Sequence, residues 1–335
     1  MPRDPVNHSK QRFDPIPRNE RRHRGQRSAK RRVERAERHW SKKTNTEHVF
    51  LDKTPGQYVD MKADGKRLTA ALSRDYPEGS LHLDRAPENG RLVVEGMALT
   101  RELKPTKVTV LRRFVNIIEA EERLEIERLW LLMQEKGLKY SRKGGGESNR
   151  SATPAIHIGI WEKFAQEPRL TAETWKKQNR EVKDLMAQLI GILSSKVAPR
   201  MAALLKAYYP QVWERQHRAL LRVRKILLAD FKEMPWLDFG GAFFAVAIKT
   251  GCSERDHLDW SDDKYGLTWV SGVGGWQGAD LRALETGMQF PLRPGEAILA
   301  NMRQMVHSAS PILQGQRITL IFFTCSLLAR HSEFE

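Results

Sequence analysis

The sequence predicts an α+β protein, in which long helices brace a compact β-barrel-like domain behind a basic tail. Two changes along the chain lead to this prediction. Between residues 171 and 232 aliphatic side chains recur at helical spacing, as on helices that pack one face against a core. After Pro235 short β-rich runs alternate with Gly, Pro and Asp turns, which is typical of a sandwich or barrel. The chain of 335 residues is long enough to bury such a core.

The first 47 residues are the predicted disordered tail. They are rich in Arg, Pro and His and almost empty of aliphatic side chains, so they bury too little apolar surface to fold alone. Met1 to Lys43 contains 15 Lys/Arg against 5 Asp/Glu, whereas the rest of the chain contains 42 against 36, for a total net charge of +16. Such a block favours nucleic acid as the partner. A localisation signal and a solubilising tail are the alternatives.

The sequence also favours an intracellular, nuclear protein without a membrane span. The opening segment MPRDPVNHSK has no apolar stretch of the kind that a secretory signal needs. Apolar runs such as residues 242–248 are far too short to cross a bilayer. Two cysteines, Cys252 and Cys325, argue against a disulfide scaffold and for a reducing compartment. The oligomeric state is left open.

Residues 48–150 are expected to form a mixed α/β region. Residues 80–84 and 91–95 alternate in polarity around the turn-forming segment 87–90, which predicts a β-hairpin. Residues 110–136 carry apolar side chains at roughly helical intervals, which predicts a helix.

Residues 151–235 are expected to form a helical bracing region. The pattern predicts two long amphipathic helices over 171–209 and 212–232, broken at Pro199 and Pro210 because proline lacks the backbone donor that a helix interior needs. Their aliphatic stripe is interpreted as packing surface.

Residues 236–335 are expected to form the β-barrel-like core. Its predicted strands are residues 242–248, 267–273, 288–292, 297–300 and 317–325.

A possible metal site begins with His257 and Asp259, which form an H-x-D motif. Residues two apart on an extended segment share one face, so both side chains can reach one ion. With a second His they would form a 2-His-1-carboxylate triad, which leaves adjacent positions open on Fe(II). The motif alone is weak evidence, and the chain contains a second copy at residues 82–84. That copy is interpreted as an ordinary half-exposed strand, because no suitably spaced His and Arg follow it.

The copy at His257 is followed by suitable partners. His307 comes fifty residues later, behind a Pro-Gly turn, and Arg317 opens the apolar run 318–323. An arginine at the head of an apolar strand is costly to bury unless it meets an anion, and guanidinium binds carboxylate through two parallel hydrogen bonds. Thr319 lies two residues on, with a hydroxyl on the same face.

These motifs carry a resemblance to a known family. Residues 239–331 resemble the double-stranded β-helix (jelly-roll) core of 2-oxoglutarate/Fe(II)-dependent dioxygenases, and more narrowly the TET/JBP-like proteins of fungal genomes. Residues 157–235 resemble the same group, and none is identified for residues 1–110. The segments that carry the resemblance are FGGAFFAVAIKTG, HLDWSDDKYG, GGWQGADL, PLRPGEAIL and VHSASPILQGQRITLIFFT.

The resemblance implies Fe(II) ligands at His257, Asp259 and His307, and a 2-oxoglutarate anchor at Arg317 with help from Thr319. The implied activity is that of a dioxygenase that uses Fe(II), 2-oxoglutarate and O₂. The metal would perform the oxidation, while the barrel orients the substrate and excludes solvent.

The resemblance further implies a methylated nucleobase in DNA as substrate, either 5-methylcytosine or N6-methyladenine, flipped out of the duplex. Asp262 matches one position that reads the base in the family. At a second such position this chain has Cys325 where the family often has His, so the base is left open. Trp260 and Tyr265 are candidate stacking partners, with packing against the helices as the alternative. Lys249 is expected to extend to the barrel rim rather than to contact the co-substrate.

Two other functions stay open. The barrel fold does not fix the substrate, so the chain could hydroxylate a protein or a small molecule. It could also be a catalytically silent nucleic-acid-binding module, although such a module has no need of the triad and Arg317.

Overall fold

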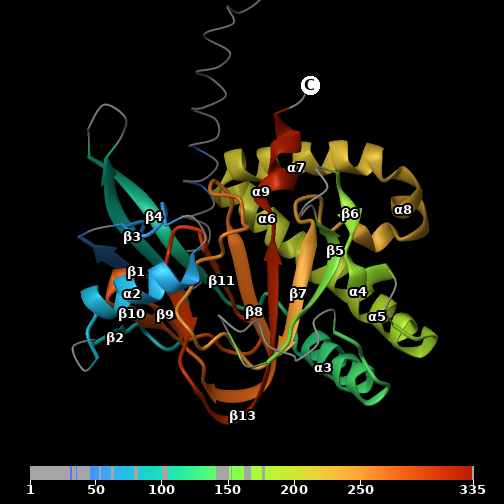
Figure 1. The fold of residues 1–335 in the computed structure, drawn as a ribbon, viewed down its shortest axis with the longest axis horizontal. Coiled ribbons are helices and arrows are strands. Elements are labelled where there is room, and N and C mark those ends of the chain that lie inside the picture. The colour runs from blue at the N-terminus through green and yellow to red at the C-terminus, as the bar shows by residue number, and fades with distance from the viewer. Residues whose placement is uncertain are drawn as a thin grey trace, which may run out of the picture.

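The computed structural model describes residues 31, 35, 46–52, 54–61, 64–78, 82–99, 105–140, 151, 153–161, 167–175 and 178–333. The predicted basic tail at residues 1–47 lies almost entirely outside the described residues. In the described part, helices cover one face of a large β-sheet, and a small β-sheet lies on its other face (Figure 1). No helix of this part is both long and apolar enough to cross a bilayer.

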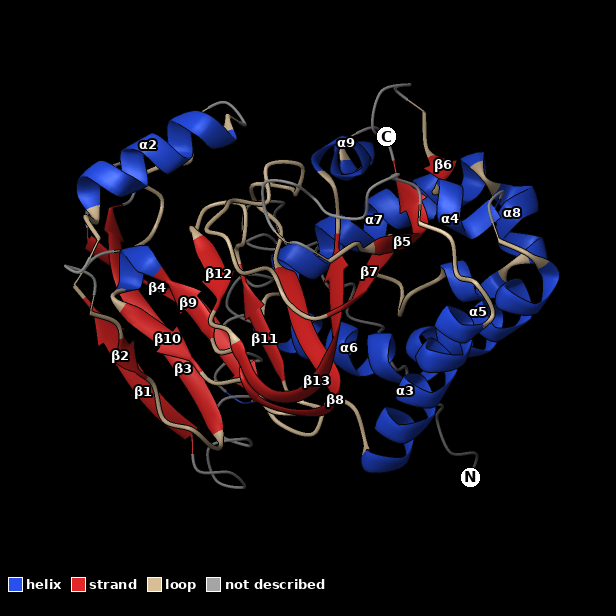
Figure 2. Ribbon diagram, turned by 60° about the horizontal axis from the view of Figure 1, so that its bottom comes forward, coloured by secondary structure: helices blue, strands red, loops and turns tan. Residues whose placement is uncertain are grey.

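The large sheet has nine strands in the order β1-β3-β4-β11-β8-β13-β7-β5-β6, and the small sheet has four in the order β12-β9-β10-β2. The small sheet lies opposite part of the large sheet (Figure 2). Residues of both sheets line a cavity. This confirms the α+β, jelly-roll core that the sequence predicted. In chain order the strands are β1 (Thr46–Leu51), β2 (Asp84–Arg85), β3 (Arg91–Leu99), β4 (Pro105–Phe114), β5 (Ile156–Trp161), β6 (Arg169–Leu170), β7 (Ala245–Thr250), β8 (Thr268–Gly278), β9 (Leu281–Ala283), β10 (Met288–Phe290), β11 (Ala297–Ala300), β12 (His307–Ala309) and β13 (Ile312–Phe323).

All of the helices in the described residues except α2 gather on the outer face of the large sheet (Figure 1). The helices are α2 (Gly65–Asp75), α3 (Ala120–Glu135), α4 (Ala172–Trp175), α5 (Arg180–Ile192), α6 (Ala198–Tyr208), α7 (Pro210–Ile226), α8 (Leu228–Glu233) and α9 (Ser326–Ala329). A π-helical turn at Leu193–Val197 joins α5 to α6, and short 3-10 turns lie at Pro235–Leu237, Leu284–Thr286 and Arg330–Ser332. Of these helices, α2 lies apart, beside the small sheet (Figure 2).

Strand β13 contributes side chains both to the core beneath the helices and to the polar cavity. Its residues Ile318, Leu320 and Phe322 are buried in the main core beneath α3, α5 and α6. The alternate residues, among them Arg317 and Thr319, line the space between the sheets. Successive side chains of a strand point to opposite faces, so one β-strand supplies both the helix-facing core and the polar cavity.

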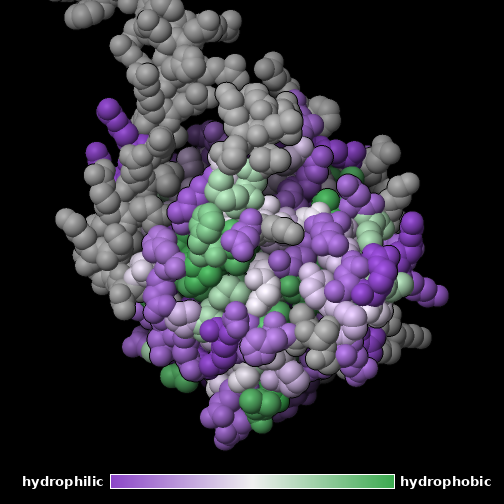
Figure 3. All heavy atoms as spheres, turned by 90° about the vertical axis from the view of Figure 1, so that its left-hand side faces the viewer, coloured by the Kyte–Doolittle hydropathy of each residue, from purple (hydrophilic) through white to green (hydrophobic). Residues whose placement is uncertain are grey.

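A second apolar core lies between the sheets, next to the polar cavity, and Leu281 belongs to both. It includes Leu92, Leu111, Phe290 and Ile298, all of which are buried. On the other side of β1, His48 and Phe50 are exposed. Figure 3 shows this side of the molecule, where hydrophilic side chains cover most of the surface around one larger apolar group.

The predicted hairpin and the predicted helix over residues 110–136 are partly wrong. The segment β2 pairs with β10 in the small sheet, whereas β3 pairs with β1 and β4 in the large one. Residues 105–114 form strand β4, and the helix begins only at Ala120. The β-branched residues of β4 match the strand period as well as the helical one, and pairing with β11 decides between them.

The predicted helix break at Pro199 is also wrong, whereas the break at Pro210 is confirmed by the non-helical backbone of Tyr209 before α7. Pro199 lies in the first turn of α6, directly after the π-helical turn. A wider π turn displaces the carbonyl that the proline ring would otherwise meet, so the helical run continues through the proline.

Candidate active site

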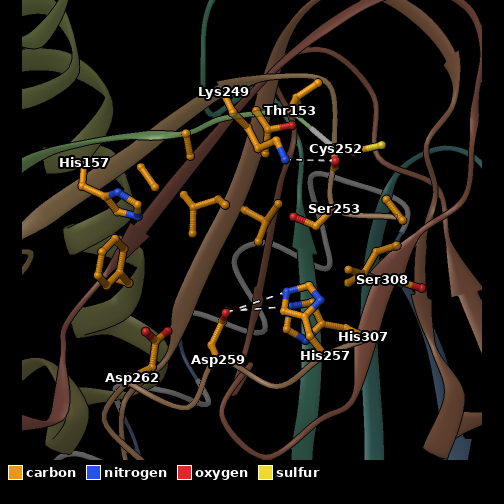
Figure 4. Close-up of a pocket in the computed structure, with 18 of the residues that line it drawn as sticks. Thr153, His157, Lys249, Cys252, Ser253, His257, Asp259, Asp262, His307 and Ser308 are labelled. Carbon is orange, nitrogen blue, oxygen red and sulfur yellow. Dashed lines mark hydrogen bonds and ion pairs between the residues drawn. The ribbon is translucent and has the colours of Figure 1, made fainter. Parts of the chain in front are cut away.

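Three side chains that the sequence singled out meet at the small sheet. His257, Asp259 and His307 offer ligand atoms that all lie within 4.8 Å of one another. The Nε2 atoms of His257 and His307 lie 3.8 Å and 3.7 Å from the Asp259 carboxylate. Both histidines are more than nine-tenths buried. The structure thus brings the predicted triad together (Figure 4).

Backbone hydrogen bonds hold both imidazole rings in place on the side away from Nε2. His257 and His307 exchange two N–H···O hydrogen bonds of 3.0 Å, which form an isolated β-bridge next to β12. The Nδ1 atom of His257 lies 2.7 Å from the carbonyl of Arg255, and that of His307 lies 2.9 Å from the carbonyl of Met305. A carbonyl can only accept, so Nδ1 carries the proton in each ring and the Nε2 lone pair is directed at the shared point.

The second H-x-D motif does not form a metal site. His82 and Asp84 lie 3.4 Å apart at the outer end of the small sheet, with side chains 90% and 80% exposed. No further metal-binding group within the described residues joins them. The H-x-D motif therefore forms a metal site only where the fold places a third ligand, His307, beside it.

The metal ligands line a cavity of about 170 Å³ between the two sheets, and Arg317 lies in its wall. The guanidinium is 97% buried, with Nη1 donating to the carbonyl of Ala279 at 2.8 Å. Its Nε is buried without a hydrogen-bond acceptor among the described residues. Burial lowers the pKa of Arg317 to about 10, so the side chain still carries its charge at neutral pH.

Glycine makes room for this arginine. A Cβ placed at Gly272 of β8 would lie 3.2 Å from Nε of Arg317 and 3.0 Å from the ring of Trp276. That ring lies 5.2 Å from the guanidinium carbon. The neighbouring strand therefore leaves space for the charged group, which a larger residue would fill.

Two further polar side chains share the wall with Arg317. Thr319 donates from its hydroxyl to the carbonyl of Gly251 at 2.6 Å. Lys249, its partner across the strand pair, is 96% buried and donates to the carbonyl of Cys252 at 3.1 Å. The expectation that Lys249 extends to the barrel rim is wrong, because alternation along β7 directs it into the cavity.

The side of the cavity near β5 and the start of α9 has a different character. His157, Trp161 and Phe323 all line it, with ring centroids 4.8 to 6.1 Å apart and ring planes steeply inclined to one another. Ala247 provides a small neighbour on β7, opposite His157. Asp262 lies on the same side as His157, across from Lys249 and Cys252 (Figure 4). The cavity thus has a basic part and an aromatic part, with the metal ligands beside both.

Asp262 is the predicted substrate residue that does line the cavity. It is buried and accepts a hydrogen bond of 2.6 Å from the Thr268 hydroxyl. Trp260, Tyr265 and Cys325 are not in the cavity wall. Trp260 packs against the α2 region, Tyr265 is 61% exposed, and Cys325 is buried in the core beneath α7.

Sequence reasoning missed the aromatic wall. His157 and Trp161 lie on β5, about a hundred residues before the metal motif. Strand β5 reaches the cavity only by pairing with β7. The alternation of IHIGIW predicts a strand, yet nothing local tells which sheet edge receives it.

Comparisons with known proteins find similarity only among solved structures. No family model matches the chain, and no curated protein matches it significantly. Solved structures that are similar to it include NgTET1 in complex with 5mC DNA, at 13% identity and a TM-score of 0.48, over 75% of this chain and 82% of that one. A 2OG-Fe(II) oxygenase family protein from Burkholderia pseudomallei is 12% identical with a TM-score of 0.37, over 83% and 95% of the two chains. A Pseudomonas putida prolyl-4-hydroxylase is 14% identical with a TM-score of 0.34, over 64% and 91%.

The TM-scores of these three structures all lie below 0.5. The chemistry of this chain therefore follows from the geometry of its own site.

Proposed function

We propose that the chain is an Fe(II)- and 2-oxoglutarate-dependent dioxygenase that oxidises a methylated nucleobase in nucleic acid, with DNA favoured. One observation carries the proposal. A single buried cavity holds a two-histidine, one-carboxylate triad and a buried guanidinium with an unsatisfied donor. Action on DNA would place the protein in the nucleus.

The triad fits Fe(II) by its donor set. Two neutral imidazoles and one carboxylate on one side of a point are the ligands of non-haem iron oxygenases. His257, Asp259 and His307 would hold the ion, and their backbone hydrogen bonds keep Nε2 available. Bound iron would supply the activation of O₂ that no amino-acid side chain can perform.

The basic part of the cavity fits a dicarboxylate. Arg317 has a buried donor without an acceptor, which is costly unless an anion meets it. Thr319 and Lys249 line the same part and add a hydroxyl and a second cation. These groups would bind the far carboxylate of 2-oxoglutarate and so orient its keto acid end toward the metal ligands.

The aromatic part fits a planar ring that bears an amino group. Phe323 and His157 offer ring surfaces, and stacking on such surfaces tolerates any nucleobase. Asp262 offers a carboxylate that can accept from an exocyclic amine, which 5-methylcytosine and N6-methyladenine both retain. A base in a duplex would have to leave the stack to reach this site.

Succinate formation tests the proposal. The protein is incubated with iron, 2-oxoglutarate and a panel of oligonucleotides containing either methylated base, beside methylated RNA and proline- or lysine-containing peptides. Substrate-dependent succinate and an oxidised base, identified by mass spectrometry, are expected for one nucleic acid. Stimulation by a peptide alone would overturn the nucleobase assignment, and no turnover with a metal-loaded protein would favour a silent binding module.

Asp262→Asn separates base reading from folding. Asparagine keeps an oxygen for the Thr268 hydroxyl while replacing one acceptor of the carboxylate with a donor. We expect the variant to retain thermal stability and substrate-independent decarboxylation but to lose most base oxidation. Equal loss of all three would assign Asp262 a structural role only.

A further inference from the structure

We infer that helix α7 carries a binding surface for the sugar-phosphate backbone of the nucleic acid whose base enters the cavity. This surface consists of Arg215, Arg218, Arg222 and Lys225, which we name the α7 stripe, together with Lys264 and Tyr265. The inference rests on the proposed function, since it names the polymer that would present the base. It adds a site within the folded domain, separate from the basic tail.

The helical period places the basic residues of the stripe on one side of α7. Positions 215, 218, 222 and 225 follow the i, i+3, i+7, i+10 spacing, which keeps them within about 80° around the helix axis. The buried residues Gln216, Ala219, Leu220 and Val223 face the other way, toward the core. The helix carries five basic residues and one acidic residue, Glu214. The stripe therefore lies on the side of α7 that faces away from the core.

Arg218 and Lys225 are exposed, and Arg222 is partly exposed. Arg218 and Arg222 lie four residues apart, about 6 Å along the axis. Arg215 at the near end pairs with Asp263 at 2.5 Å and approaches Glu333 at 3.7 Å. Arg215 thus links α7 to the rest of the fold through ion pairs. The more exposed cations of the stripe follow it along the helix.

Tyr265 is the second, independent observation. Tyr265 is 61% exposed, so its ring is available to a partner. The guanidinium carbon of Arg215 lies 5.2 Å from the ring centroid, and Nζ of Lys264 lies 4.7 Å from it. Tyr265 and the exposed Lys264 thus combine a stacking surface for a base with a charge for a phosphate.

The surface is joined to the aromatic part of the cavity through short links. Gln216 of α7 donates to the Thr324 hydroxyl at 3.1 Å, directly after Phe323 of the cavity wall. Asp263, which Arg215 contacts, follows Asp262 of the same wall. Figure 1 shows α7 and α9 together at the end of the molecule where β13 terminates. A strand held along α7 would therefore lie near the part of the cavity assigned to the base.

The combination favours nucleic acid over an acidic protein. Acidic peptides are bound through charge alone, whereas the flat ring of Tyr265 adds stacking that only a base or another aromatic exploits. An acidic polypeptide is accordingly kept as a competitor in the experiment.

The test is Arg218→Glu/Arg222→Glu in the full chain, with binding of fluorescent single- and double-stranded 20-mer DNA measured by anisotropy between 50 and 300 mM salt. The matched control is Lys139→Glu/Lys183→Glu, which changes the net charge equally at exposed lysines near α3 and α5. We expect the α7 variant to bind at least about tenfold more weakly at low salt, with the slope of log K against log salt reduced by roughly 1.4 to 1.8. The control should keep its slope. Tyr265→Ala should weaken single-strand binding more than duplex binding.

Several results would overturn the inference. They are an unchanged slope in the α7 variant, an equal loss in the control, or equal competition by polyglutamate and oligonucleotide of the same charge. Binding is measured without iron or 2-oxoglutarate, so it does not depend on oxidation. If no base is oxidised but the slope falls, the proposed chemistry fails and the surface stands. If base oxidation occurs and the slope is unchanged, the α7 surface fails and the proposed chemistry stands.

Discussion

Replacing Arg317 should abolish productive binding of 2-oxoglutarate while leaving the metal site intact. The guanidinium is buried, charged at neutral pH and holds one donor without an acceptor. Removing one partner of a buried charge pair costs about 3–5 kcal/mol, which corresponds to a loss of roughly 150- to 4,000-fold in affinity. Arg317→Ala should therefore raise the dissociation constant by about that factor. Arg317→Lys should recover only part, because an ammonium group cannot form two parallel hydrogen bonds.

The assay is calorimetric titration of 2-oxoglutarate into protein loaded with Mn(II), which binds such triads without turnover. Arg113→Lys is the matched control. Arg113 is also buried and also donates to backbone carbonyls, those of Gly90 and Pro291, but it lies outside the cavity. It should lower thermal stability without changing affinity. Wild-type affinity in both Arg317 variants, with Mn(II) still bound, would refute the anchor assignment.

Three other outcomes follow from particular contacts. Asp259→Ala should abolish metal binding, measured by metal analysis after dialysis, whereas Asp84→Ala in the exposed second motif should leave it unchanged; equal metal content would contradict the triad. Arg200 donates two hydrogen bonds that lower the pKa of Glu122, so Glu122→Gln should reduce the free energy of unfolding by about 1–3 kcal/mol at neutral pH. This difference should be fully present above the ordinary pKa of a glutamate and be lost as the pH falls through the lowered pKa of Glu122 in the folded protein, and a pH-independent difference in denaturant unfolding would argue against the ion pair. Deleting residues 1–43 should flatten the salt dependence of DNA binding by about 0.9 per lost phosphate contact without abolishing base oxidation, and an unchanged slope would restrict the tail to localisation.

The sequence allowed the metal-binding end of the site to be predicted because its signals are local. The pair His257 and Asp259 is two residues apart, and Arg317 and Thr319 repeat the same interval on β13. Side chains two residues apart on an extended strand lie on the same face because of backbone geometry alone, so this spacing can be recognised without knowing the rest of the fold. Only His307 required a long-range step, and the order of motifs along the chain supplied it. The H-x-D motif alone does not separate His257 from His82, and it was the His and Arg that follow only the copy at His257 that distinguished the two.

The parts that were predicted poorly are those decided by pairing between distant strands. Residues 105–114 fit a helix and a strand, and β3 and β11 on either side select the strand. His157 is another example, since β5 contributes to the cavity only because β7 accepts it as a neighbour. Lys249 was misplaced for a related reason. A lysine at the end of a strand usually extends to solvent, and only the enclosing sheet shows that this one cannot.

The charges of the cavity explain why a divalent cation and a dicarboxylate belong there together. Among its lining residues, Lys249 and Arg317 contribute two positive charges, and Asp259 and Asp262 contribute two negative ones. The cavity is therefore formally neutral before either ligand arrives. A divalent cation alone, or a dianion alone, would leave two net charges in a buried space, which is costly. Binding both restores neutrality, so each should strengthen the binding of the other by the same factor, as linkage requires. The same balance explains the buried lysine: without Lys249 the loaded cavity would carry a net negative charge, and Arg317 alone could not offset both aspartates and the co-substrate.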